Sequence, residues 1–198
     1  MMIKTSLRYL SIIALSLSAS FAMAAQYNLQ AEQSSLHFVS IKNDNVAETH
    51  HFSELSGSID KEGKVTIRIE LASVETHIAI RNERMQSLFF NVAKMPQATI
   101  SAHLSKALLK QLKSGAVLDQ VLPVTIELHG KQKTQDSDLR IAVLANGDVQ
   151  VSTQNPLIID AADFGLADGI EQLRDIAGLK SITRIVPVTA TLLFSSSK

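Results

Sequence analysis

The fold is decided by the stretch "KVTIRIEL" at residues 64–71, in which apolar and polar side chains alternate without a break. In an extended chain, successive side chains point to opposite faces, so the apolar members of this stretch share one face. These members are Val65, Ile67, Ile69 and Leu71. The pattern predicts a β-strand with one buried side and one wet side.

The same period of two recurs in "VTIELHG" at residues 124–130 and in "DLRIAVLANGDVQVST" at residues 138–153. The second stretch contains Asn146-Gly147 between two β-type runs, a pair that favours a type I′ turn. We therefore expect a hairpin there. The stretch "SGSIDKEGK" at 56–64 predicts another turn, between a strand near residues 52–59 and the strand that begins at Lys64.

The final run "SITRIVPVTATLLF" at 181–194 is also β-rich. Pro187 cannot donate a ladder hydrogen bond, so we expect a bent strand with this residue at an edge, a bulge or a strand end. Two segments have helical spacing instead, residues 79–90 and residues 166–179, and the second should end at Gly178. Residues 104–115 are a third candidate, for a helical connection.

Many alternating strands and few helices indicate an all-β, mainly antiparallel fold. A closed barrel with short inserted helices leaves no exposed strand edges, whereas a sandwich would have to protect them. Periodicity alone does not separate the two architectures.

The N-terminal residues have the features of a secretory signal peptide. Lys4 and Arg8 precede an apolar stretch, and the small residues Ala22 and Ala24 lie at the −3 and −1 positions of a cleavage site. The apolar stretch is shorter than the roughly 18 residues that a membrane-spanning helix needs. We expect cleavage after Ala24, a mature domain at residues 25–198 with no transmembrane segment, and a periplasmic location.

Composition narrows the function further. Residues 1–24 hold two of the 19 basic residues and none of the 19 acidic ones, so residues 25–198 carry 17 basic and 19 acidic residues, a formal charge of −2. A nucleic-acid partner is not expected, because it would call for a basic face. The chain has no cysteine, so its stability has to come from burial and backbone pairing.

Residues 81–90, "RNERMQSLFF", place two arginines one helical turn apart before an apolar run. Together Arg81 and Arg84 could hold a phosphate or carboxylate headgroup through forked hydrogen bonds. The alternative is that they pair with Glu75, Glu83 or other local acids on a wet surface.

Neither a metal site nor a catalytic motif is predicted. Glu48 and His50 in "AETHHF" share a face, but a zinc site needs further ligands and the other histidines are scattered singly. The chain also lacks a G-x-S-x-G motif, and without cysteine it has no thiol nucleophile.

Several spaced motifs together give the mature chain a family resemblance. They are "YNLQAEQSSLHFVSIKN" (27–43), "LSGSID" (55–60), "SVET" (73–76), "RNERM" with "LFF" (81–90), "MPQAT" (95–99), "LHGK" (128–131), "DFGL" (163–166), "LRDIAGLKSI" (173–182) and "VPVTATLLF" (186–194). In this order they resemble the YceI family of exported lipid-binding proteins. The resemblance implies an extended lipocalin-like antiparallel barrel whose apolar interior holds a polyisoprenoid or similar amphiphile, and it makes a homodimer plausible.

On this basis we expect a binding site inside the barrel. The predicted cavity lining is Phe38, Phe52, Ile67, Ile69, Ile126 and Leu128, with Leu88, Phe89 and Phe90 closing one end and Arg81 and Arg84 at the mouth. Plain core packing is the alternative for each lining residue, because filled and ligand-bearing barrels share the same alternation.

Three functions remain open from the sequence. The first is a periplasmic carrier of an isoprenoid lipid, a quinone-like molecule or another long amphiphile, without a catalytic role or a cofactor. The second is a hydrolase or isomerase that uses Glu127, His129 and the arginines. The third is a partner protein of a redox or stress-response system.

Overall fold

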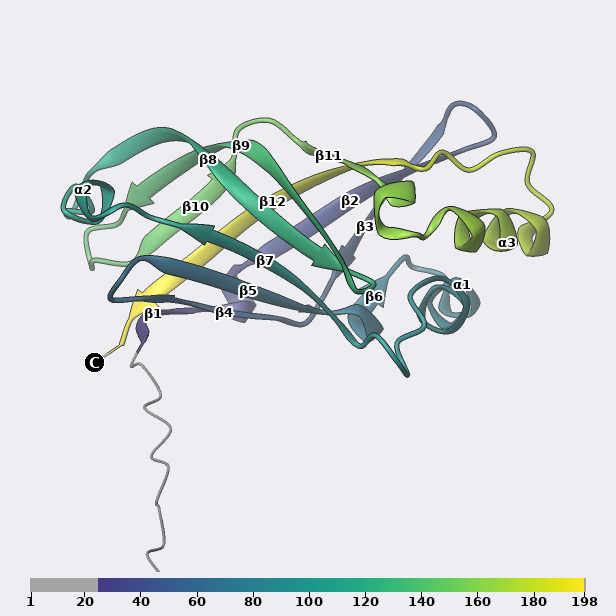
Figure 1. Cartoon of the computed structure of the whole chain (residues 1–198), viewed down its shortest axis with the longest axis horizontal. Helices are drawn as coiled ribbons and strands as arrows, with labels where there is room; N and C mark the ends of the chain where they lie inside the picture. The colour runs from purple at the N-terminus through teal and green to yellow at the C-terminus, as the bar shows by residue number, and fades with distance from the viewer. Residues whose placement is uncertain (1–24, 198) are drawn as a thin grey trace, which may run out of the picture.

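Strand β5 (Lys64–Glu70) forms where the alternation predicts it, and its two faces differ as expected. Ile67 and Ile69 are buried, whereas Arg68 is exposed. This strand belongs to an elongated antiparallel barrel in the computed structural model, which describes residues 25–197 (Figure 1). The interior face of β5 therefore contributes to the barrel core.

Eight strands form the closed ring of the barrel, and the ring closes where β1 pairs with β12, with Leu29 opposite Phe194. In ring order the strands are β1 (Ala25–Leu29), β4 (Leu55–Asp60), β5, β7 (Gln97–His103), β8 (Val117–Leu128), β9 (Lys131–Val143), β10 (Val149–Thr153) and β12 (Ile185–Ser196). Because the ring is closed, the fold is a barrel and not a sandwich, and the predicted fold class is confirmed.

The first half of β12 has different neighbours from its second half, and this lengthens the barrel beyond the ring. Here β12 pairs with β11 (Leu157–Asp160) on one side and with β2 (Ser35–Lys42) on the other. Beyond β2 follow β3 (Val46–Phe52) and the short β6 (Val74–Glu75). Pro187 lies opposite Ile158 of β11, one residue before the pairing with β2 begins at Val188, so its missing N–H is not needed by β2.

The hairpin at residues 138–153 is present, but the prediction of its turn type was wrong. Gly147 has φ +89° whereas Asn146 has no positive φ, and the loop follows a type I turn with a left-handed glycine. The two-residue turn with two positive φ values lies instead at His129-Gly130, where Leu128 pairs with Lys131. The turn at 56–64 is confirmed, although its first strand begins at Leu55 because Phe52 ends β3.

The predicted helical segments are confirmed in the described part of the chain. Helix α1 (Ala79–Arg84) continues as a π-helical turn η3 (Met85–Phe89), and α3 (Ala167–Ala177) ends at the left-handed Gly178. The third candidate is a single turn, α2 (Lys106–Leu109). Three 3₁₀ turns complete the elements, η1 (Ala31–Gln33), η2 (Leu71–Ser73) and η4 (Ala161–Phe164).

The helices lie at the two ends of the barrel. Figure 1 shows α1 and α3 together at one end and α2 at the other. Gly169 of α3 packs against Phe89 of η3, so the two helical segments form a joint cover over the end that β2, β3 and β11 extend.

The predicted signal peptide, residues 1–24, lies outside the described residues. Among the helices that the structure describes, none has both the length and the apolar character needed to cross a bilayer.

Candidate functional site

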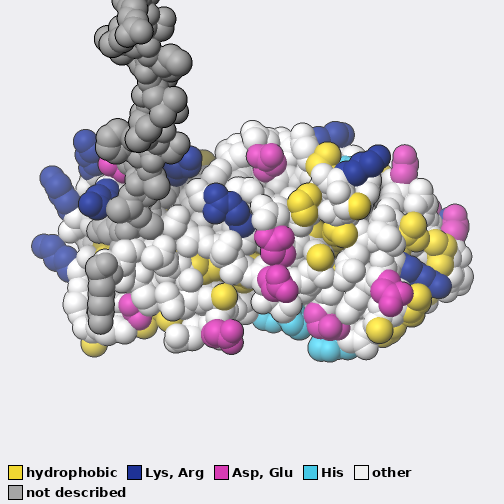
Figure 2. Space-filling model, turned by 90° about the horizontal axis from the view of Figure 1, so that it is seen from below, with side chains coloured by type: hydrophobic (Ala, Val, Ile, Leu, Met, Phe, Trp, Pro, Cys, Tyr) yellow, Lys and Arg dark blue, Asp and Glu magenta, His cyan; other side chains and the backbone are white. Residues whose placement is uncertain are grey.

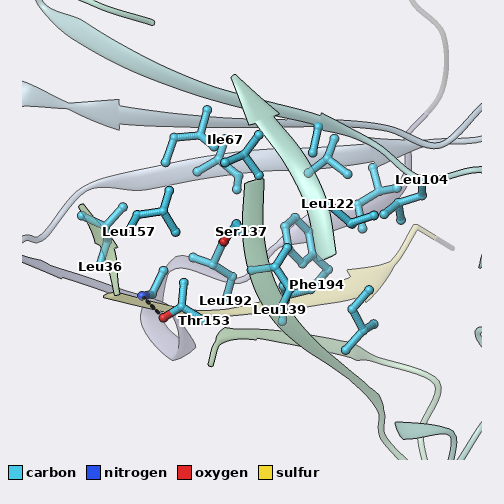
Figure 3. Close-up of a pocket in the computed structure, with 18 of the residues that line it drawn as sticks. Leu36, Ile67, Leu104, Leu122, Ser137, Leu139, Thr153, Leu157, Leu192 and Phe194 are labelled. Carbon is cyan, nitrogen blue, oxygen red and sulfur yellow. Dashed lines mark hydrogen bonds between the residues drawn. The ribbon is translucent and has the colours of Figure 1, made fainter. Parts of the chain in front are cut away.

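The barrel interior contains three neighbouring cavities. The deep cavity, of about 90 Å³, lies between β5, β8, β9, β10 and β12 and is lined by residues such as Ile67, Leu122 and Phe194 (Figure 3). The middle cavity, of about 130 Å³, is lined by Phe52, Ile126 and other apolar residues. The mouth cavity, of about 350 Å³, lies between β2, β3, α1 and α3.

The three cavities follow one another along the barrel. The deep and middle cavities share Leu36, Ile100, Leu157 and Val188 as lining residues. The middle and mouth cavities share Phe38, Phe89 and Val186. The three cavities therefore lie one behind another from the helical end of the molecule to the centre of the barrel, and neighbouring cavities share side chains as common walls; we call this series the lipid path.

The chemical character of the lining changes along this path. The middle cavity is lined by apolar side chains throughout, and the deep cavity adds only Ser137, Thr153 and Thr189 to an apolar lining. Charged residues appear at the mouth, namely Lys42, Glu48, Arg81 and Arg84. This gradient suits a molecule with a long apolar chain and one polar end.

Eight of the nine apolar residues predicted from the sequence line these cavities. Ile67 lies in the deep cavity, and the middle cavity has Phe38, Phe52, Ile69, Phe89, Phe90, Ile126 and Leu128. That they contact a ligand stays a prediction.

The structure does not bring Leu88 to the path. Its side chain is 42% exposed and lines none of the three cavities. Leu88 lies on the solvent-facing side of this turn, whereas Phe89 and Phe90, which follow it, face the interior. Phe89 and Phe90 do lie together over the interior, with ring centroids 4.7 Å apart.

Arg81 is held by a residue far away in the sequence. Its Nη1 lies 2.7 Å from Glu48 Oε2, and its Nη2 donates to the backbone carbonyl of Thr76 at 2.6 Å. Lys42 Nζ contacts the same carboxylate oxygen at 3.0 Å. Burial alone would raise the pKa of Glu48, but the hydrogen bonds from Lys42 and Arg81 outweigh it and lower that pKa.

The ion pair of Arg81 therefore involves neither Glu75 nor Glu83. Glu48 lies on β3, and the barrel brings it to α1. Arg84 also lines the mouth cavity, and among residues 25–197 no carboxylate forms a salt bridge with it. Of the two predicted headgroup residues, Arg84 is thus the one whose charge is not neutralised by a pair.

Helix α1 is positioned by Asn82. Its Oδ1 accepts hydrogen bonds from the backbone N–H and the hydroxyl of Thr76, at 2.9 and 2.6 Å. Because Arg81 also bonds to Thr76, both side chains tie the start of the helix to the segment after β6.

His50 is a buried histidine at the mouth. It is only 3% exposed, and its Nε2 is 2.9 Å from Ser40 Oγ. Burial, aided by the positive charge of Arg81, lowers the pKa of His50 to about 4, so the ring is neutral near pH 7. Its Nδ1 and the Nε of Arg81 are buried and have no hydrogen-bond partner among residues 25–197.

Ser137 is a second buried polar residue that the sequence did not single out. It is 3% exposed, lies on β9 in the deep cavity, and its hydroxyl has no partner among the described residues (Figure 3). Ser137 faces inward because it is in phase with the buried Ile141 and Val143, so continuing the alternation of residues 139–143 backwards along the strand could have located it.

The residues considered for a hydrolase or isomerase, Glu127 and His129 together with the arginines, do not lie close together at the mouth. Glu127 is exposed and accepts a hydrogen bond from Gln132, and His129 occupies the turn between β8 and β9. Neither lines the mouth cavity, where the arginines lie.

Glu48 and His50, considered above as possible zinc ligands, are engaged by other side chains. Glu48 is engaged by Lys42 and Arg81, and His50 by Ser40. Within residues 25–197, no three potential ligands converge on one point as the side chains lie.

The sequence profile of the YceI-like domain matches residues 27–194, which cover all but the outermost residues of the first and last barrel strands. The chain belongs to the YceI family. Among curated proteins, none matches the sequence significantly.

Three solved structures are similar to this chain, and in one of them more than a third of the residues are identical. A polyisoprenoid-binding domain from Saccharophagus degradans, implicated in plant cell wall breakdown, is 37% identical, with a TM-score of 0.85 over 88% of this chain and 100% of that one. The chain is thus a homologue of that domain.

Two more distant structures share the fold. BcnA from Burkholderia cenocepacia is 18% identical, with a TM-score of 0.63 over 83% of this chain and 98% of its own. The YceI protein of Campylobacter jejuni is 20% identical, with a TM-score of 0.52 over 75% and 84%.

Proposed function

We propose that the protein binds and carries an isoprenoid lipid, a quinone-like molecule or a similar long amphiphile, with the apolar chain in the deep and middle cavities and the polar end at the mouth. The observation that carries this proposal is the series of three cavities with shared lining residues, apolar inside and charged at the entrance. The identity of 37% to a polyisoprenoid-binding domain supports the same class of ligand.

The hydrophobic effect supplies the affinity without any reaction. Apolar surface removed from water contributes roughly 25 cal/mol per Å², so about 300 Å² of buried chain gives roughly 7 kcal/mol before the costs of association.

The mouth recognises the polar end. Arg84 offers a positive charge that has no salt-bridge partner in the part of the chain that the structure describes, and Lys42 and Arg81 line the same cavity. Where these groups are shielded from water, an interaction with a ligand contributes more binding free energy than the same interaction would in bulk water.

Native mass spectrometry of the gently purified protein tests this function. We expect a co-purified amphiphile of defined mass. In the Val188→Phe variant, the larger ring projects between the deep and middle cavities, and bound lipid should fall strongly. Val121→Phe is the matched control, because Val121 is exposed on the outside of β8.

Two results would contradict the proposal. One is equal lipid in the unaltered protein and a folded Val188→Phe variant. The other is an empty protein that turns over added esters, which would favour the enzymatic alternative.

We also propose that the chain is exported to the periplasm, with residues 1–24 as its signal peptide and residues 25–198 as the mature domain. Cell fractionation and N-terminal mass analysis test this. The periplasmic protein should begin at Ala25, and an intact Met1 on the bulk of the protein would contradict the proposal.

A further inference from the structure

Exposed apolar side chains border the entrance of the lipid path at the helical end of the molecule. Ile78, just before α1, and Ile80 on α1 are 46% and 51% exposed, and both line the mouth cavity. Ile176 of α3 is 47% exposed and lies one helical turn after Leu173, which lines the same cavity. Figure 2 shows apolar side chains gathered over the half of the molecule that holds α1 and α3.

These isoleucines leave apolar surface in contact with water, which is unfavourable. Single exposed apolar residues are ordinary on a protein surface. Here they come from two different helical segments and meet around one opening, an arrangement that is typical of a surface that binds an apolar partner.

The charged residues of the mouth cavity have an excess of positive charge. Lys42, Arg81 and Arg84 are cationic, and Glu48 is the one carboxylate among the described residues that line this cavity, so its formal charge is +2. Residues 25–198 as a whole carry −2. Arg84 lies one turn after Ile80 on the same side of α1. The entrance therefore combines apolar surface with local positive charge on a protein whose net charge is negative.

The acidic residues of α3 do not cancel this charge. Asp168, Glu171 and Asp175 are exposed and do not line the mouth cavity. Arg174 forms salt bridges with both Glu171 and Asp175, which balances part of their charge. The residues by which α3 lines the cavity are apolar.

We propose that the helical end of the molecule docks onto the surface of a lipid bilayer that contains anionic lipids. Ile78, Ile80 and Ile176 enter the boundary between headgroups and acyl chains, and Lys42 and Arg84 contact the headgroup phosphates. A bilayer suits this surface better than a protein partner does, because it offers apolar and anionic groups without demanding a matching shape.

Docking in this orientation places the mouth cavity against the bilayer. An amphiphile then passes between the membrane and the middle cavity without crossing water, which removes the cost of exposing its apolar chain. The inference deepens the carrier function proposed above and rests on it, since it names the surface at which the lipid is exchanged.

An environment-sensitive label tests the orientation. The chain has no cysteine, so one introduced cysteine in the full chain can be labelled specifically with nitrobenzoxadiazole. With vesicles of phosphatidylcholine and phosphatidylglycerol, the emission of a label at Ile80→Cys or Ile176→Cys should shift to shorter wavelength, because the dye leaves water. Val117→Cys is the matched control, since Val117 is 61% exposed at the start of β8, near α2 at the opposite end of the molecule, and its label should not shift (Figure 1).

Co-sedimentation with vesicles measures the apolar and the charged contributions. Ile80→Ser should lower the affinity for vesicles roughly tenfold, whereas Val117→Ser should leave it unchanged. Arg84→Gln should lower the affinity about fivefold for vesicles with phosphatidylglycerol and hardly at all for phosphatidylcholine alone. All variants share residues 1–24, so any contribution of that segment to binding is the same in each.

The Val188→Phe variant separates this inference from the carrier function. Its larger ring projects into the lipid path and leaves the docking surface unaltered, so it should lose bound lipid and still shift the label at Ile80→Cys. A label shift in a protein that takes up no lipid supports the docking surface and contradicts the carrier function.

Three results overturn the docking surface. One is equal label shifts at Ile80→Cys and Val117→Cys. Another is equal affinity of Ile80→Ser and the unaltered protein for vesicles, or no binding of either. The third is a dimer that Ile80→Ser dissociates and whose label at Ile176→Cys does not respond to vesicles, because this face would then belong to a second copy of the chain.

Discussion

Gly169 of α3 and the ring of Phe89 lie so close together that a methyl group on the glycine would be 2.9 Å from Phe89 Cδ2. Contacts this short are not tolerated between carbon atoms, so either the ring or the helix would have to move. Because Phe89 lines both the middle and the mouth cavities, this contact connects the position of α3 with the shape of the lipid path.

We therefore predict that Gly169→Ala lowers the free energy of unfolding by about 1–3 kcal/mol, as overpacking does, even though alanine favours helices over glycine. Chemical denaturation measures the change. In a Phe89→Leu background the ring is gone, and the same substitution should become neutral or stabilising. A loss of equal size in both backgrounds would show that the ring is not the cause.

Replacing Ser137 should change the free energy of unfolding in the opposite direction. Its hydroxyl is buried in a mainly apolar cavity and has no partner within residues 25–197. Ser137→Ala therefore removes a desolvated polar group and should raise the free energy of unfolding of lipid-free protein by about 1 kcal/mol. Ser56→Ala, at an exposed position of β4, serves as the near-neutral control. A clear destabilisation by Ser137→Ala would mean that a bound water satisfies the hydroxyl.

Acidification should destabilise the protein through His50. Its pKa is about 4 in the folded chain and 6.5 ordinarily, so between these values the unfolded chain takes up a proton that the folded chain does not. Stability therefore falls as the pH drops from about 6.5 to about 4, by at most roughly 3 kcal/mol. Thermal unfolding across this range measures the effect, and a folded His50→Gln variant should lose much of the pH dependence there.

The two arginines at the mouth should respond differently to replacement. Arg81→Gln leaves the partly buried Glu48 with Lys42 alone and should cost about 1–3 kcal/mol of stability. Arg84→Gln should leave stability nearly unchanged but weaken binding of an anionic amphiphile about tenfold, the loss of one charge-assisted hydrogen bond. Comparison of farnesyl phosphate with farnesol tests this, because equal losses for both would contradict a role in charge recognition.

The local patterns in the sequence were sufficient to predict where strands and helices form and which side chains of the strands face inward. The alternation at 64–71 placed Ile67 and Ile69 inside, and the helical spacing after residue 79 located α1 and the turn that follows it. They were not sufficient for turn geometry. Asn146-Gly147 has the composition of a type I′ turn, but loop length and strand register decide the type, and His129-Gly130 adopts it instead.

Contacts between distant strands were beyond the reach of the sequence. Nothing local indicates that Glu48 meets Arg81, or that His37, His51 and His77 stand in a row, because each contact depends on which strands are neighbours. The histidines looked scattered for this reason. Leu88 was wrongly assigned to the interior because an apolar run in a helix does not reveal which of its members faces outward.

The pairing of β1 with β12 has a consequence for how the molecule is made. The first and last strands of the domain meet at the seam, with Tyr27 opposite Ser196. Contacts between residues so far apart in the chain form slowly, because a long loop must close first. A growing chain cannot close its barrel until β12 has been synthesised, so the strands made earlier wait for their last partner.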